Sequence, residues 1–218
     1  MAAYFTLTLD TTAPTGGSIS IPASSNVVNI TATLSATGAT YMKLYGDIAA
    51  TSGSSTAISE SDASWVAYGT SASVYLTTGD GTKTVYVKFK DDVGNVSAAA
   101  SATCVLDTTA AVVTIVGPDV ATISKVSGYN VSAFTFSADE AFVEWTVRVV
   151  PATSSNHSAG TEIPSTGGST NMHGTTATAA DTAVSCTIYG ADLETASAGD
   201  GAKIIKVFVK DTHGNWSV

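Results

Sequence analysis

The chain has 218 residues, of which 44% are hydrophobic and 12% are charged. This length suits two ordinary domains or one large domain. Nine Lys and Arg stand against eighteen Asp and Glu, which gives a formal net charge of −9. That balance argues against nucleic acid or an anionic membrane as a partner, and no stretch is long and apolar enough to predict membrane insertion.

The chain begins with an alternating segment, residues 4–9, whose large apolar side chains are Tyr4, Phe5, Leu7 and Leu9. The alternation predicts a short strand. The first ten residues lack the basic region and the apolar block of a signal peptide. As written, the chain is therefore not expected to enter a secretion pathway by itself.

The phrase Leu-Asp-Thr-Thr-Ala occurs twice, at residues 9–13 and 106–110, and each copy predicts a boundary. We expect an N-terminal strand and linker over residues 1–12, a first domain over 13–107 and a second domain over 108–218.

Short apolar runs separated by turn residues predict about seven strands in each domain. In the first domain the expected strands are 18–21, 27–35, 41–45, 65–68, 74–76, 85–90 and 98–106; in the second they are 112–115, 131–137, 142–149, 184–189 and 205–210. This spacing is typical of an all-β fold made of antiparallel β-sandwiches. A pair of up-and-down barrels fits less well, because residues 155–181 are too loop-like for even strand spacing.

An internal repeat supports two domains, since residues 79–97 and 199–217 align without a gap. In the first copy Val85, Val87 and Phe89 form the inward-facing set of a half-buried strand. In the second copy the inward set is Ile205, Val207 and Val209, and the outward set is Lys206, Phe208 and Lys210.

Each copy of the repeat then breaks at the pattern Asp-x-x-Gly-Asn. Gly94 and Gly214 are expected to have positive φ there, because a residue with a Cβ resists that conformation. A turn into the closing strand of the domain should follow.

Several of these features resemble tandem bacterial and phage immunoglobulin-like (Big-type) domains, which occur in virion proteins, adhesins and surface hydrolases. They are the Asp-Thr-Thr-Ala-Pro linker, the Trp65-x-x-Tyr68 pair, the run of residues 79–87 and the Asp-x-x-Gly-Asn-x-Ser close. The resemblance covers the chain as two copies, although the second lacks the Trp-x-x-Tyr pair and has Ala110-Ala111 in place of Ala-Pro. It implies two tandem immunoglobulin-like antiparallel β-sandwiches that serve as spacers, decorations or binders, and seldom as catalysts.

The second domain lacks a segment equivalent to residues 98–106, the closing strand of the first domain. An open sheet edge is a template for another strand. One interpretation is that the N-terminal strand, with Tyr4, Phe5, Leu7 and Leu9, completes the second domain of a neighbouring copy in a head-to-tail assembly. The other is that these 218 residues are a piece of a longer chain whose next residues supply the strand.

Cys104 and Cys186 fall one in each repeat, so neither repeat can hold the bridge that joins the two sheets of an antibody domain. We expect two free, buried thiols, which fits folding in a reducing cytosol. The three histidines lie in weakly patterned segments, with no nucleophile elbow and no zinc or redox spacing nearby. The sequence therefore predicts that the protein is not an enzyme and needs no cofactor, calcium being the one metal worth weighing.

Four carboxylates are candidates for calcium: Asp10, Asp91, Asp92 and Asp107. They would gather near the domain junction if each linker packs against an Asp-x-x-Gly-Asn turn, and calcium takes six to eight oxygen ligands. The alternative is that each Asp accepts backbone N–H bonds in its own turn.

Three aromatic residues, Trp65, Tyr68 and Trp216, are candidates for a glycan site, because aromatic rings stack on the apolar faces of sugars. The alternative for all of them is packing within the domain, which is also expected of Trp145 in the middle of a strand.

These observations favour a structural or adhesive protein, first of all a phage virion component such as a tail, neck, fibre or capsid decoration, assembled in the host cytoplasm. Its expected partners are other copies of itself or other virion proteins, and a cell-surface glycan is a further candidate. The alternatives are a fragment of a secreted bacterial adhesin at the cell surface, or an accessory module of a surface hydrolase.

Overall fold

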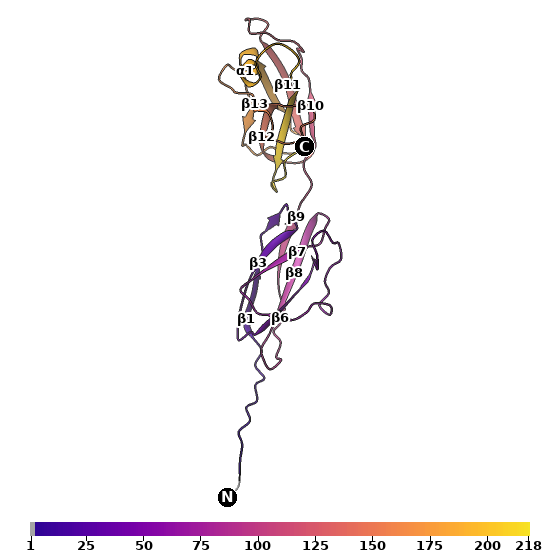
Figure 1. Ribbon diagram of the computed structural model, residues 1–218, viewed down its shortest axis with the longest axis vertical. Coiled ribbons are helices and arrows are strands. Elements are labelled where there is room, and N and C mark those ends of the chain that lie inside the picture. The colour runs from indigo at the N-terminus through magenta and orange to yellow at the C-terminus, as the bar shows by residue number, and fades with distance from the viewer. Residues whose placement is uncertain (1–2) are drawn as a thin grey trace. The chain divides into compact units, whose positions relative to one another are not determined.

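The computed structural model describes residues 3–218. The chain forms two compact units, Met1–Thr108 and Thr109–Val218, and each is built from β-strands (Figure 1). We describe each unit by itself.

The first unit is a sandwich of two sheets. One has the order β1 (Thr15–Ser20), β3 (Asn29–Thr37), β7 (Ser71–Leu76) and β5 (Ile48–Ala49); the other has the order β2 (Ser24–Ser25), β9 (Ala100–Leu106), β8 (Gly81–Lys90), β4 (Tyr41–Gly46) and β6 (Val66–Ala67). All of these pairings are antiparallel except that of β2 with β9. This is the immunoglobulin arrangement, with β1, β3, β7 and β5 as strands A, B, E and D, and with β4, β8 and β9 as C, F and G.

The core of the first unit comes from the alternation in β8 and β9. Val85, Val87 and Phe89 are fully buried, which confirms the inward set expected for this strand. Cys104 and Leu106 of β9 are also fully buried. The closing strand of the first unit is therefore part of its hydrophobic core.

The second unit repeats this plan with fewer strands. One sheet has the order β10 (Val113–Val116), β11 (Val131–Ala138) and β15 (Val184–Tyr189). In the other sheet, β12 (Phe142–Val149) pairs with β16 (Ile205–Asp211) on one side and with the short strands β13 (Thr161–Glu162) and β14 (His173–Gly174) on the other. These strands correspond to A, B, E, C and F, and the described residues include no counterpart of β9.

A short helix, α1 (Gly190–Ala196), follows β15 and was not expected from the sequence. Leu193 and Ala196 pack against the core of the second unit, and Asp192 is buried. No helix among the described residues is long and apolar enough to cross a membrane.

Aromatic side chains fill the core of the second unit. Phe142 meets Trp145 edge-on, with ring centroids 6.0 Å apart, and Phe136 packs beside both. Trp145 is only 6% exposed, and its indole N–H donates to the carbonyl oxygen of Asn171 at 3.0 Å. The core position expected for Trp145 is confirmed.

Phe208 departs from the expected alternation, because it is buried although it shares the outer face of β16 with Lys206 and Lys210. Segment 151–162 is tied to that face: Lys206 Nζ donates to the carbonyl oxygen of Ser154, and Arg148 Nε donates to that of Ala159. The outward prediction for Phe208 was wrong because a loop covers this face of the sheet.

Candidate functional site

The two Asp-x-x-Gly-Asn turns are held by their first carboxylate. Asp91 Oδ1 accepts the backbone N–H groups of Val93, Gly94 and Asn95 at 3.1, 2.7 and 2.7 Å. Asp211 Oδ1 does the same for residues 213–215, at 2.6–2.9 Å. Gly94 and Gly214 have φ of 103° and 100°, which confirms the positive φ expected at both positions.

This bonding affects the acidity of Asp91. Burial by itself would raise its pKa, but the hydrogen bonds from Asn95, Gly94 and Val93 stabilise the carboxylate and lower the pKa below its ordinary value. The structure thus gives Asp91 the role of a turn acceptor, as the alternative to calcium binding anticipated.

The four calcium candidates do not gather at one place in the first unit. Asp10 Oδ1 accepts the N–H of Thr12, and its carbonyl oxygen accepts from Asn95 Nδ2 at 3.3 Å, so the linker does lie against the turn of Asp91. Asp92 is exposed beside this turn. Asp107, however, follows the end of β9 that pairs with Gly81, at the opposite end of β8. Because a strand rises about 3.3 Å per residue, roughly 30 Å separate Asp107 from Asp91.

The second unit holds an acidic pair that sequence reasoning missed. An oxygen of Glu140 and one of Asp211 lie within 4.8 Å of each other. Asp211 Oδ1 already accepts three backbone N–H groups, so this oxygen serves the turn first.

The most distinctive feature of the second unit is the side of β16 that faces away from β12. Val209 N donates to Ser217 Oγ at 3.0 Å, and Ser217 N donates to the carbonyl oxygen of Val209 at 2.9 Å. Val150 N donates instead to the carbonyl oxygen of Ile204, on the β12 side. Because backbone groups alternate along a strand, those of Val207 and Ile205 point to the same side as those of Val209.

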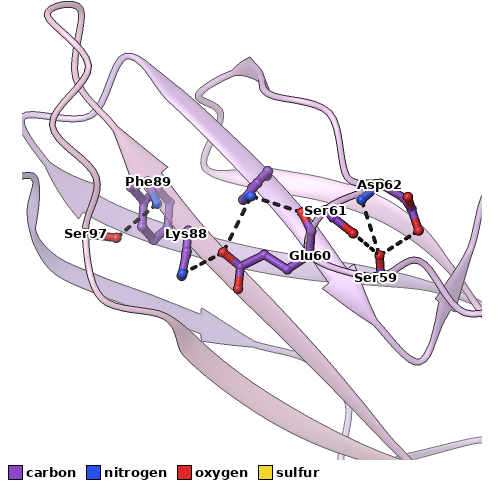
Figure 2. Close-up of polar contacts among 8 residues, drawn as sticks. Ser59, Glu60, Ser61, Asp62, Lys88, Phe89 and Ser97 are labelled. Atoms are coloured by element: carbon purple, nitrogen blue, oxygen red, sulfur yellow. Dashed lines mark hydrogen bonds and ion pairs between the residues drawn. The ribbon is translucent and has the colours of Figure 1, made fainter.

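In the first unit this side of the corresponding strand is occupied. Phe89 N donates to Ser97 Oγ at 3.0 Å, as Figure 2 shows, and β9 then pairs with β8 from Val87 back to Gly81. In the second unit the equivalent bonds reach Ser217, and no strand of the described part of the chain continues along Val207 and Ile205. β16 therefore presents an open edge.

The missing neighbour shortens β16 at its start. β8 runs over ten residues from Gly81, whereas β16 begins only at Ile205, the counterpart of Val85. In the first unit β4 pairs with Val85–Lys90, so residues 81–84 have only β9 as a ladder partner. Their counterparts, residues 201–204, lie outside any strand. The first part of this strand thus depends on a closing strand.

Two hollows flank the open edge. The first, which we call the edge hollow, has a volume of about 390 Å³ and lies between β10 and β16, lined by Ala111, Val113, Ile205 and Val207 among others. The second, the inner hollow, has a volume of about 930 Å³. Its lining includes Ile115, Ile123, Phe134, Leu193 and residues 199–203. In the first unit Cys104 and Leu106 of β9 join the core at the corresponding edge.

The N-terminal segment, residues 4–9, has the side chains that such an edge needs. Tyr4, Phe5, Leu7 and Leu9 are 93%, 87%, 83% and 86% exposed. The expectation that this segment is a strand was wrong for the structure described, in which it carries no strand arrow (Figure 1). A strand exists only through its ladder partners, and residues 4–9 have none here.

The glycan candidates do not form one platform. The ammonium groups of Lys43 and Lys90 lie over the ring of Trp65, at 5.1 and 4.8 Å from its centroid. Tyr68 faces the core instead: its ring meets Phe89 edge-on and its hydroxyl accepts the N–H of Ala36. Trp216 belongs to the second unit, where it stacks on His157 with ring centroids 4.2 Å apart.

Lys43, one of the two lysines over Trp65, shares Glu60 with Lys88. Lys88 Nζ lies 2.6 Å from Glu60 Oε1, and this contact is drawn in Figure 2. Lys43 Nζ lies 3.6 Å from the same oxygen. Both lysines are largely covered, with side chains 24% and 13% exposed. On this outer face of the first unit, two packed lysines therefore share a single carboxylate.

Both thiols are unpaired and buried, as the sequence predicts. Burial raises the pKa of Cys104, and it raises the pKa of Cys186 to about 12. Because the thiolate is the reactive form, these cysteines are protected from oxidation and alkylation in the folded chain.

No family model matches the chain, and no curated protein matches it. Among solved structures, the chain is similar over 93% of its length to 30% of the chitinase ChiA74 from Bacillus thuringiensis, with 13% identity and a TM-score of 0.34. It is also similar over 91% of its length to 20% of Escherichia coli alpha-2-macroglobulin activated by porcine elastase, with 10% identity and a TM-score of 0.32. The chain thus spans less than a third of either protein.

Proposed function

We propose that this chain is a non-catalytic structural protein that assembles head-to-tail through strand donation. The observation that carries the proposal is the open edge of β16, flanked by two largely apolar hollows. The same chain carries an exposed, alternating segment with four large apolar side chains. Each feature is a liability in isolation, since open edges and exposed apolar surfaces promote association.

Donor and acceptor sit in different units, so the contact between two copies is heterologous. Such a contact generates a ring if the rotation closes and an open filament if it does not. Main-chain hydrogen bonds would supply affinity, and the hollows would select the side chains of the donor. Repeated copies of one chain would then build an extended structure.

A virion part such as a tail, neck, fibre or capsid decoration is the setting that we propose for this assembly, with other virion proteins as further partners. Two buried, unpaired thiols are compatible with folding in a reducing host cytoplasm. The acidic composition, with a net charge of −9, keeps a repetitive assembly soluble and away from nucleic acid.

The test is the mass of the purified chain in solution, measured by light scattering over a concentration series. We expect mass to rise with concentration for the native chain and to stay at one copy for Leu7→Asp, which places a charge on the donor. Thr8→Asp is the matched control, because it adds the same charge at the neighbouring position on the opposite face. A native chain that stays monomeric up to millimolar concentration would overturn the proposal and leave the open edge to some other strand.

A further inference from the structure

We propose a specific partner and register for the open edge: residues 4–9 of a second copy lie antiparallel to β16, with Leu9 opposite Gly201 and Phe5 opposite Ile205. This inference rests on the proposed function and specifies how the donor is bound. It follows from two internal alignments of the chain, one for the donor and one for the acceptor.

The donor alignment comes from the repeated phrase. Leu9 and Leu106 both precede Asp-Thr-Thr-Ala, so Leu7 corresponds to Cys104 and Phe5 to Ala102. In β9, Cys104 and Leu106 are fully buried, while Thr103 and Val105 are exposed. The N-terminal segment reproduces this alternation, with Thr6 and Thr8 at the exposed positions.

The acceptor alignment comes from the gapless repeat of residues 79–97 in 199–217. In the first unit Leu106 pairs with Gly81 and Ala102 with Val85. Gly81 corresponds to Gly201 and Val85 to Ile205. Transferring the register places Leu9 opposite Gly201 and Phe5 opposite Ile205.

This register puts Phe5, Leu7 and Leu9 where the second unit has space. Residues 199–203 and Ile205 line the inner hollow, so Leu7 and Leu9 enter it beside Leu193 and Ile123. Phe5, opposite Ile205, reaches the place where the two hollows adjoin, because Ile205 and Ile115 line both. Phe5 and Leu7 are larger than Ala102 and Cys104, which suits a site that the described residues leave unfilled.

The backbone of the acceptor has the matching polarity. Val209 directs its N–H and C=O to the open side, and alternation gives the same direction to Val207, Ile205, Lys203 and Gly201. Donor pairing would therefore extend β16 back over residues 201–204, as β9 does for residues 81–84. The second unit would gain its full F strand together with its closing strand.

The register can be read out by disulfide trapping between two singly substituted chains. Thr6→Cys and Ile204→Cys are opposite each other in this register, at a pair equivalent to Thr103 and Thr84. The native thiols do not interfere, because Cys104 and Cys186 are 0% and 1% exposed. Mixing the two variants with oxidised glutathione should give a covalent dimer as the main product.

The matched control pairs Thr6→Cys with Ala202→Cys, which lies two residues away on the same face. Diagonal positions lie about 7–8 Å apart, beyond the Cα separation that a disulfide spans. We expect at least a tenfold lower yield of covalent dimer. A higher yield from this pair than from Thr6→Cys with Ile204→Cys would overturn the register and leave strand donation intact.

Two further outcomes separate the inference from the proposed function. Assembly that persists by light scattering without covalent dimer from either pair would overturn the donor assignment alone. A chain that carries both Thr6→Cys and Ile204→Cys could also form a disulfide within itself. If only this intramolecular disulfide formed, the second copy would be overturned as the partner. Absence of both assembly and covalent dimer would overturn the proposed function as well.

Discussion

Asn95 Nδ2 donates a hydrogen bond to Asp91 Oδ2 at 2.8 Å, and the same side chain donates to the carbonyl oxygen of Asp10 in the preceding linker. One amide thus ties the linker to the turn that it precedes. The arrangement repeats in the second unit, where Asn215 donates to Asp211 and to the carbonyl oxygen of Thr109.

Removing the turn acceptor should destabilise the first unit. Asp91→Ala leaves three backbone N–H groups without their acceptor, and we expect the melting temperature of this unit to fall by roughly 5 °C or more. Calorimetry of the whole chain measures the shift. Asp92→Ala, at the exposed neighbouring position, should change it by less than about 1 °C. Equal effects of the two variants would argue against the turn as the cause.

Acid should weaken both units. Burial opposes ionisation of Asp91 and Asp192, yet the hydrogen bonds that they accept lower the pKa of each below the ordinary 3.8. A carboxyl whose folded-state pKa is depressed stabilises the fold fully above its unfolded pKa, and this contribution is lost as pH falls through the folded value. The free energy of unfolding, measured with urea, should therefore decline steeply below about pH 4. In Asp192→Asn the free energy of unfolding should decline less steeply with falling pH. An unchanged slope would contradict the role given to the Asp192 carboxylate.

Hydrogen bonding along the open edge of β16 can be prevented without changing the existing pairing of β16 with β12. Lys203 lies two residues before β16, and its N–H would point to the open side once a donor extends the alternation of the strand back to it. Lys203→Pro removes that donor, so light scattering should show assembly weakened at least tenfold, with the melting temperature of the isolated chain nearly unchanged. Lys203→Ala loses the same side chain but keeps the N–H, and it should assemble normally. Similar behaviour of both variants would mean that the main chain is not involved.

The two thiols should be inert in the native chain. Burial raises the pKa of Cys186 to about 12, so almost no thiolate is present at pH 8. We expect iodoacetamide to label Cys104 and Cys186 only at the rate of unfolding, and to label both quickly in urea. Mass spectrometry would follow the reaction, and rapid native labelling of either cysteine would show that its core opens locally.

Chelation should leave the chain unchanged. Asp91 and Asp211 use their oxygens for backbone N–H groups, and Asp107 lies far along the first unit from Asp91. We therefore expect the same melting temperature with a chelator and with added calcium. A rise of several degrees in calcium would instead show a site that stabilises the folded state by mass action, and would favour the adhesin alternative.

The sequence predicted the bounds of strands well where an alternation of apolar and polar residues ends at turn residues. The expected strands 142–149 and 184–189 have the same bounds as β12 and β15. Gly94 and Gly214 were predictable for the same local reason, since the repeat places glycine where φ is positive.

Features that depend on distant contacts could not be predicted in this way. Nothing local shows that Phe208 is buried, because the alternation of the strand places it beside two lysines. The seven-residue helix α1 is too short for a clear helical period, and it is held by packing of Leu193 and by Asp192, which accepts N–H groups of Gly167 and Ser169. Asp107 could be placed only once the pairing of β9 with β8 was known.

Residues 201–203 lie outside any strand, and this has a consequence for the fate of single copies. A backbone without ladder partners opens more easily to the active site of a protease than one held in a sheet. The peptide bond after Lys203 would then be open to a trypsin-like protease in a lone copy and shielded once a neighbour's strand lies against it. Limited digestion would therefore distinguish unassembled subunits from assembled ones. In a cell, proteases would by the same difference degrade the copies that remain unassembled.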